Sequence, residues 1–334
     1  MGPPLPGMSR AAGVYKGERS VEYRNLGRSG LRVSAVGLGC NNFAGRIDLE
    51  ATRRVIHKAI DAGITLFDTA DAYGNMGGSE DFMGQVLGER RKDIVLATKF
   101  ALPMDKAETL KGASRRYIMT AVEASLRRLR TDWIDLYQQH RPDPDTPIEE
   151  TLRALDDLVR QGKVRYIGCS NLPSWQVVEA KWTSKSCNLG SFVSCQDEYS
   201  LVVRDIEREL VPAMTAYNMG LLPFFPLASG FLTGKYKRGA PMPEGSRLQT
   251  TPRFQDRYAT EKNWKIVEGL TAFAQARGHT MLELAFSWLA CQPVVSSVIA
   301  GATKPEQIEA NVKAIGWKMT AEELAEIDRI SQPA

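Results

Sequence analysis

Residues 133–171 read WIDLYQQHRPDPDTPIEETLRALDDLVRQGKVRYIGCSN, and this stretch decides the fold. Short apolar runs typical of strands, at 133–137 and 164–169, flank a helical pattern at 147–161. Thr146 predicts a helix N-cap, Pro147 fills the first helical position, Glu149 completes a capping box, and Gly162 predicts the helix end. A strand, a helix and a second strand in this order predict parallel strands with a right-handed crossover.

The same alternation continues in both directions along the chain. Eight strand–helix units across about 300 residues predict an α/β fold of the (β/α)8 TIM-barrel type, and an open doubly wound sheet is the alternative. The sequence GLGCNN after the first strand breaks the GxGxxG dinucleotide fingerprint, which favours the barrel. The predicted strands are 35–39, 64–67, 94–98, 133–137, 164–169, 192–196, 221–225 and 294–299. The predicted helices are 49–61, 79–90, 114–130, 147–161, 173–181, 207–218, 261–276 and 305–315.

Three segments lie outside this repeat. Residues 1–20 are predicted to be a flexible tail, and 21–334 a single barrel domain. YRNLGRSGLRVSAV, residues 23–36, predicts an N-terminal β-hairpin because glycines bracket a turn between two alternating runs. The segment 229–260, after strand seven, contains many glycines and prolines and predicts a long lid loop.

Composition excludes several classes of function. The 334 residues carry 43 basic and 39 acidic side chains, so no excess charge points to nucleic acid. There is no apolar run of membrane-spanning length, and the sequence starts without the apolar core of a secretory signal. None of the three histidines lies three or four residues from another, which predicts no metal site. The five cysteines have no regular spacing, which predicts reduced thiols in a cytoplasmic protein. The oligomeric state is not readable from the sequence.

Asp68, Tyr73, Lys99 and His140 each follow a short apolar run, in TLFDTADAYG, IVLATKF and WIDLYQQH. The carboxyl ends of barrel strands lie on one face, so these side chains are expected to meet. Reduction of a carbonyl leaves an alkoxide that needs a proton, and Tyr73 is the expected donor. An ammonium about 4 Å away favours a phenolate by about 4 kcal/mol, or roughly three pKa units, so Lys99 is expected to make the Tyr73 phenol more acidic.

The remaining two residues complete the expected chemistry. Asp68 would keep Lys99 charged, and His140 would donate a hydrogen bond to the carbonyl oxygen. Each residue also has an ordinary structural interpretation: Tyr73 as a loop aromatic, Lys99 as a surface charge, Asp68 as a cap, and His140 as a packed side chain. Their joint occurrence at three successive strand ends favours catalysis.

The chain resembles the aldo-keto reductase superfamily from about Tyr23 to Ile330. The similar blocks are FDTADAYG, IVLATKF, the stretch from Ile134 to Asn171, PLASGFLTGKY and GATKPEQIEANV. The resemblance implies Asp68, Tyr73, Lys99 and His140 as the catalytic residues, with Tyr73 as general acid. It also implies a nicotinamide cofactor.

The resemblance further implies a cofactor site along the later strand ends. Ser170, Asn171 and Gln196 would hold the nicotinamide carboxamide, and Phe224 would stack on its ring, where the family usually has tyrosine. The pyrophosphate would contact Leu227, Ser229, Gly230, Lys235 and Arg247. The 2′-phosphate of NADPH would lie at the helix start formed by Gly301, Thr303, Lys304, Gln307 and Asn311.

Two departures bear on cofactor choice. Many relatives have an arginine where Gln307 stands and a lysine where Gly301 stands, which weakens discrimination against NADH, yet NADPH (NADP+) stays the expected cofactor. The alternative to a reductase is a nicotinamide-binding regulatory subunit, as in the similar β subunits of voltage-gated potassium channels. His140 favours turnover. The substrate is a small carbonyl compound of unknown identity, and expected pocket residues are Asn42, Phe43, Met76, Phe100, Trp133 and Phe224, although core packing suits Trp133 better.

Overall fold

The structure, a computed structural model, describes residues 21–332, and the predicted tail at 1–20 lies outside the described residues. An antiparallel hairpin comes first: β1 (Tyr23–Asn25) pairs with β2 (Arg32–Ser34). Gly27 in its turn has a φ of 55°, and a Cβ there would lie 2.6 Å from the backbone nitrogen of Gly220. The turn therefore requires glycine. The predicted N-terminal hairpin is confirmed.

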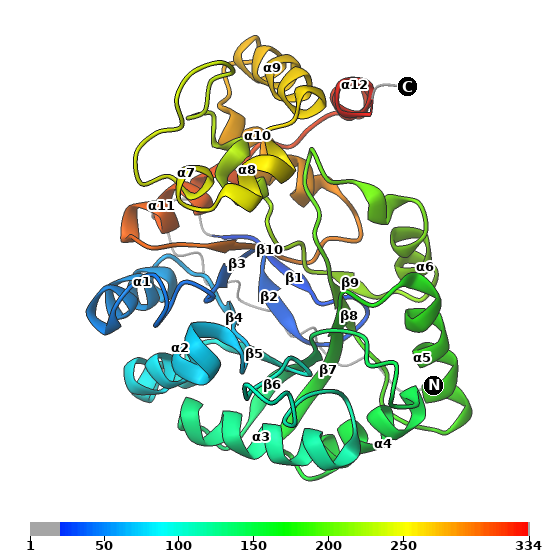
Figure 1. The fold of residues 1–334 in the computed structure, drawn as a ribbon. Coiled ribbons are helices and arrows are strands. Elements are labelled where there is room, and N and C mark those ends of the chain that lie inside the picture. Colours follow the sequence, from blue (N-terminus) through cyan, green and yellow to red (C-terminus); the bar gives the residue numbers. More distant parts are fainter. Residues whose placement is uncertain (1–20, 333–334) are drawn as a thin grey trace, which may run out of the picture.

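Eight parallel strands follow, each hydrogen-bonded to the next, and β3 also pairs with β10. A parallel bridge joins Leu221 to Val295, and the Ile299 N–H donates to the Pro223 carbonyl at 3.0 Å. Figure 1 shows the strands curled about one axis with helices outside, consistent with a (β/α)8 barrel. The strands are β3 (Val36–Gly39), β4 (Leu66–Asp68), β5 (Val95–Phe100), β6 (Ile134–Gln139), β7 (Val164–Ser170), β8 (Ser194–Gln196), β9 (Gly220–Leu221) and β10 (Val298–Gly301).

Helices follow the strands and cover the outside of the sheet (Figure 1). In α3 the predicted apolar face is confirmed, because Ile118, Val122, Leu126 and Leu129 are all buried. The covering helices are α1 (Leu49–Asp61), α2 (Tyr73–Leu87), α3 (Arg115–Leu129), α4 (Ile148–Arg160), α5 (Ser174–Ser186), α6 (Leu210–Ala216) and α11 (Pro305–Ala314). Two 3-10 turns, η1 (Gly88–Asp93) and η2 (Asp205–Glu207), lie between elements.

The start of α4 differs from the prediction. Its N-cap is Pro147, which has no capping side chain, and the Thr146 hydroxyl donates to Asp143 Oδ2 at 2.8 Å. The capping-box prediction is wrong because the helix begins one residue later than expected, which leaves Thr146 before the cap, and Glu149 accepts from Arg153 Nε at 2.8 Å instead. Gly162 does end the helix, with a left-handed φ of 76°.

The C-terminal third contains more helix than predicted. The segment 229–260 is not wholly irregular, since it holds most of η3 (Ala228–Thr233) and all of α7 (Arg247–Thr250) and α8 (Pro252–Tyr258). The helix α9 (Glu261–Gln275) matches its prediction, whereas α10 (Met281–Cys291) and α12 (Ala321–Ser331) are additional. Eight residues of α10 are buried, and its sequence is apolar almost throughout. It therefore lacks the alternation of apolar and polar residues with a 3.6-residue period from which a helix is predicted.

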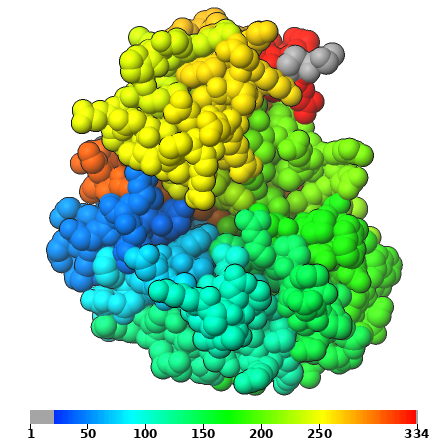
Figure 2. All heavy atoms as spheres, in the orientation of Figure 1, coloured from blue at the N-terminus to red at the C-terminus, as the bar shows by residue number. Residues whose placement is uncertain are grey.

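The hairpin closes one end of the sheet. Leu26 and Val33 from the hairpin pack with Leu66, Ala97 and Leu136 from three strands, in a cluster separate from the main core. Figure 2 shows the surface hollowed beneath the yellow segment, where that segment faces the blue and green loops. Among residues 21–332, no helix has the length and apolar character needed to cross a lipid bilayer.

Candidate active site

The structure brings the four predicted catalytic residues together. Asp68 ends β4, Lys99 lies near the end of β5, His140 directly follows β6, and Tyr73 opens α2. Lys99 Nζ lies 2.6 Å from Asp68 Oδ2 and 3.4 Å from the Tyr73 hydroxyl. The rings of Tyr73 and His140 meet edge to face, with centroids 5.6 Å apart. Two hydrogen bonds therefore link the aspartate, the lysine and the tyrosine.

A strained turn fixes the position of Tyr73. Gly74, Asn75, Met76 and Gly77 all have positive φ, between 62° and 113°. A Cβ on Gly74 would lie 2.6 Å from the backbone oxygen of Phe43, so this position needs glycine. Non-glycine residues in such conformations are held by their surroundings and often mark functional sites. Regular helix resumes after the turn, close to the predicted start at residue 79.

The electrostatic state of the site corrects one expectation. Burial raises the pKa of Tyr73, and the opposing charge of Lys99 does not overcome it, so the phenol is not made more acidic than free tyrosine. Burial disfavours the charged ammonium, but Asp68 and Tyr73 outweigh this effect and raise the pKa of Lys99. Burial, with the nearby Lys99 charge, lowers the pKa of His140 well below its ordinary value. The imidazole is therefore neutral at physiological pH.

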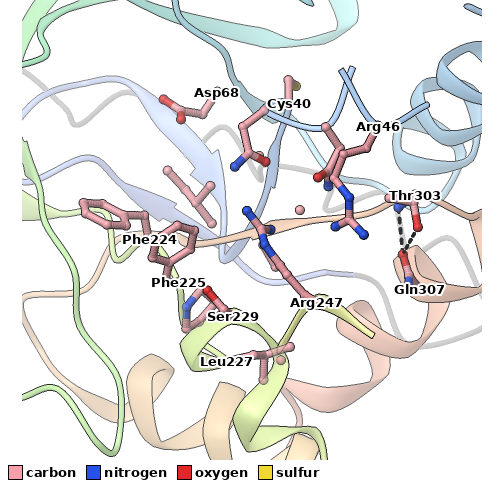
Figure 3. A pocket seen from close by; sticks show the side chains of 18 of the residues that line it. Cys40, Arg46, Asp68, Phe224, Phe225, Leu227, Ser229, Arg247, Thr303 and Gln307 are labelled. Atoms are coloured by element: carbon pink, nitrogen blue, oxygen red, sulfur yellow. Dashed lines mark hydrogen bonds between the residues drawn. The ribbon is translucent and has the colours of Figure 1, made fainter. Parts of the chain in front are cut away.

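A cavity of about 680 Å³ opens beside these residues. Figure 3 shows part of its lining, including Asp68. Asp68, Tyr73 and His140 line it, whereas the fully buried Lys99 lies behind them. All fourteen predicted cofactor residues line the same cavity: Ser170, Asn171, Gln196, Phe224, Leu227, Ser229, Gly230, Lys235, Arg247, Gly301, Thr303, Lys304, Gln307 and Asn311. The volume suits a molecule of cofactor or drug size.

The cavity is strongly cationic. Lys235, Arg247 and Lys304 line it as predicted, and the structure adds Arg46 and Arg141. In residues 21–332 none of these five cations makes an ion pair, and Asp68 is the one carboxylate among the lining residues. Figure 3 shows Arg46 and Arg247 reaching toward the same space from opposite walls. This charge distribution suits a polyanionic ligand.

Arg46 lines the cavity, and the sequence patterns did not predict it there. It lies in the loop after β3, at the same end of the sheet as the catalytic residues. A cation in the first strand–helix loop could have been selected by the same strand-end rule that selected Lys99. Arg247 was predicted, and it packs against two aromatic rings, with its guanidinium carbon 5.5 Å from the Phe225 centroid and 5.2 Å from that of Phe254.

The residues predicted to hold the carboxamide form one hydrogen-bonded group. The Ser170 hydroxyl donates to the backbone carbonyl of Gln196 at 2.7 Å, and Asn171 Nδ2 donates to Ser170 Oγ at 2.7 Å. Neither side chain caps α5, whose N-cap is Pro173. At the other end of the cavity, Gln307 Oε1 accepts from the backbone N–H of Thr303 at 2.7 Å (Figure 3). That bond stabilises the turn into α11.

Most of the expected substrate-pocket residues lie elsewhere. Asn42 and Phe224 line the cavity, but Phe43 and Phe100 are fully buried in the main core. Met76 is 47% exposed outside the cavity. Trp133 precedes β6, at the opposite strand end, and stacks with Arg91 at 4.4 Å. Bulk alone did not distinguish core from pocket, because side chains on both faces of a buried strand are apolar.

Comparisons with known proteins agree with this geometry. A family model described as the aldo/keto reductase family matches residues 35–332. A probable voltage-gated potassium channel subunit beta of Arabidopsis thaliana is 39% identical over 306 residues, covering 88% of this chain and 91% of that protein. A putative subunit of the same name from Schizosaccharomyces pombe is 39% identical over 325 residues, covering 93% and 94%. The chain belongs to the aldo/keto reductase family.

Proposed function

We propose that this chain is an NADPH-dependent oxidoreductase that reduces aldehydes or ketones to alcohols, with Tyr73 as general acid. The observation that carries the proposal is the Asp68–Lys99–Tyr73 hydrogen-bond chain at one end of a cavity whose other end is cationic. When bound, the reduced nicotinamide supplies the hydride. The protein's part is to bind the carbonyl oxygen and to protonate it.

Tyr73 and His140 divide that work. The raised pKa of Tyr73 keeps the phenol protonated at neutral pH, so the proton is in place before the reaction. An alkoxide is a far stronger base than a phenolate, so transfer from Tyr73 is favourable as negative charge develops on the oxygen. Lys99 then stabilises the resulting phenolate at 3.4 Å. A neutral His140 imidazole can donate one hydrogen bond to the same oxygen.

The cavity wall fits a nicotinamide dinucleotide phosphate. Asn42 Oδ1 is buried without a hydrogen-bond partner in the described chain and can accept from a bound ligand. Lys304 stands at the start of α11, where free backbone N–H groups favour an anion. Arg46 supplies a cation that compensates for Gln307 and Gly301, which replace cations of many relatives. These features support NADPH over NADH.

The proposal includes the setting of the reaction. The segment 229–260 would act as a lid over the cofactor, because three of its residues line the cavity. Ser229 belongs to η3, Lys235 follows η3, and Arg247 begins α7. Residues 21–334 would form one domain located in the cytoplasm. A small carbonyl compound would be the only substrate besides the cofactor.

The relatives raise a second possibility, because they are named as potassium channel subunits. A regulatory subunit would bind the nicotinamide without needing a group to polarise a carbonyl. His140 is present, buried and in contact with Tyr73, which favours turnover.

The test is NADPH oxidation against a panel of aldehydes, ketones, sugars and quinones, with fluorescence titration of NADPH in parallel. We expect at least one carbonyl class to be reduced. Tight NADPH binding without turnover of any member would favour the regulatory alternative, and absence of binding would refute both.

A further inference from the structure

Gln138 lies at the centre of the catalytic group, although the sequence patterns did not select it. It belongs to β6 and is completely buried. In the sheet register it stands beside Lys99 on β5 and Gly168 on β7. Neighbouring residues in register share a face of the sheet, so Gln138 lies on the same face as Lys99.

The side chain of Gln138 connects two residues that the proposed function uses separately. Its Nε2 donates to Asp68 Oδ1 at 3.1 Å. Gln196 Nε2 donates to the same Asp68 oxygen at 2.8 Å and to Gln138 Oε1 at 3.4 Å. The Asp68 carboxylate thus receives Lys99 on one oxygen and two amide groups on the other.

This arrangement fixes the orientation of Gln196. Its Nε2 has two hydrogens, and Asp68 and Gln138 accept one each. Gln196 can therefore offer the cavity only its carbonyl oxygen, which is an acceptor. An acceptor is the group required to bind the NH₂ of a carboxamide.

The barrel interior leaves space for Gln138. A Cβ on Gly168 would lie 3.3 Å from Gln138 Cγ and 2.7 Å from Ser194 Oγ. Gly168 has no left-handed conformation to explain a glycine there, since it is not among the residues with positive φ. Its lack of a side chain is explained by the two polar side chains packed against it.

We propose that Gln138 is a positioning residue, which holds the Asp68 carboxylate toward Lys99 and fixes the Gln196 amide with its oxygen toward the cofactor. Gln138 itself is completely buried and is not among the residues that line the cavity. The inference rests on the proposed function, because it assigns Asp68, one partner of Gln138, to proton transfer and Gln196, the other partner, to nicotinamide binding.

The test replaces the amide by a side chain of similar length and shape, in Gln138→Met. The matched control is Gln139→Met, since Gln139 is also buried on β6, is its direct neighbour, and bonds only to the backbone oxygen of Arg141. We expect Gln138→Met to lower kcat about 10- to 100-fold, with little change in the KM of the carbonyl substrate, because the proton-transfer group is misplaced rather than lost. We expect its Kd for NADPH to rise about three- to tenfold, because Gln196 loses one of its two hydrogen bonds while Asp68 still holds the other.

A purely structural role predicts a different pattern. Both variants would then lower the unfolding temperature and leave kcat and the NADPH Kd close to wild type, which would overturn the proposal. If Gln138→Met does not fold, Gln138→Asn, which keeps a shorter amide, must show the same loss of kcat for the proposal to stand. A wild-type chain that binds NADPH but reduces nothing would refute the proposed function alone. The NADPH Kd of Gln138→Met and Gln139→Met would then still show whether Gln138 positions Gln196. A chain that binds no nicotinamide nucleotide overturns both.

Discussion

The two ends of the cavity are built in opposite ways. At the proposed catalytic end, Lys99 is completely buried and Asp68 is 3% exposed. Both are already hydrogen-bonded within the protein, Lys99 to Asp68 and Tyr73, and Asp68 also to Gln138. At the other end, Arg46 and Lys304 are exposed and make no ion pair among the described residues. One end is organised before any ligand arrives, and the other leaves its positive charges to be neutralised by a ligand.

This difference has an energetic reason. Buried charges are costly unless they are paired, so the bond between Lys99 and Asp68 offsets the cost of burying them. Exposed cations stay hydrated at little cost, and they can therefore remain unpaired until an anion binds. Substitutions at the catalytic end should change both chemistry and stability, whereas those at the cationic end should change affinity alone.

Tyr73→Phe gives the largest expected effect. Removing the hydroxyl removes the proton donor but leaves the cationic end intact, so kcat should fall about 10²- to 10⁴-fold while the Kd for NADPH stays near wild type. Steady-state kinetics and fluorescence titration measure the two quantities. Near wild-type reduction of a good aldehyde by this variant would remove Tyr73 from the role of general acid.

Lys99→Met should affect stability as well as rate. The substitution leaves the buried Asp68 carboxylate without its cation, and the loss of one partner of a buried pair lowers the free energy of unfolding by about 3–5 kcal/mol. Because Lys99 opposes the effect of burial on the pKa of Tyr73, its removal should raise the apparent pKa that governs reduction. Urea denaturation and a pH–rate profile test both effects. An unchanged profile would exclude Lys99 from the mechanism.

The difference between the two ends also explains which residues could be predicted from the sequence. The catalytic end follows from strand ends, because a parallel barrel places Asp68, Lys99 and His140 on one face whatever the loops do. Arg46 and Gln138 were not predicted from the sequence, for different reasons. Arg46 looks like any exposed loop cation, and Gln138 looks like a polar residue within a strand until three-dimensional pairing places it beside Asp68.

The helices show the same limit. The amphipathic α3 was predicted from its apolar face, whereas α10 is buried nearly all round and carries no periodic signal. The acidity of Tyr73 was mispredicted because a sequence gives the neighbouring charge but not the burial that opposes it.

Lys304→Ala should affect the cationic end alone. A charge-assisted contact to the 2′-phosphate is worth about 1.5–3 kcal/mol, so NADPH binding should weaken by roughly 10- to 150-fold while NADH binding changes little. The low end is expected, because Arg46 and Arg247 remain in the same cavity. Unfolding free energy should not change. Equal weakening of both cofactors would make Lys304 structural.

Arg46→Ala is the matched variant at the same cationic end. If the cations share the phosphates, this variant should also weaken NADPH more than NADH, and added salt should reduce the difference between wild type and variant. Unaffected NADPH binding in Arg46→Ala would leave Arg247 and Lys304 as the phosphate cations.

The smallest expected effect on activity concerns Asp71, two residues before Tyr73. Its carboxyl is 1% exposed, its Oδ1 has no partner in the described chain, and burial raises its pKa to about 8. The unfolded chain gives up this proton near its ordinary pKa of 3.8, so between these two values the folded state holds more protons than the unfolded state. Stability is therefore lost as pH rises toward 8.

Asp71→Asn removes this dependence, so between pH 6 and pH 9 the unfolding free energy of the variant should fall by roughly 2–3 kcal/mol less than that of wild type. Asp197, whose pKa burial also raises to about 8, should keep part of the slope. Urea denaturation across this pH range, with Lys304→Ala as the control from the cationic end, measures the change. A slope in Asp71→Asn equal to that of wild type would show that Asp71 is ionised in the folded chain, and the catalytic end would then tolerate an unpaired buried charge beside Tyr73.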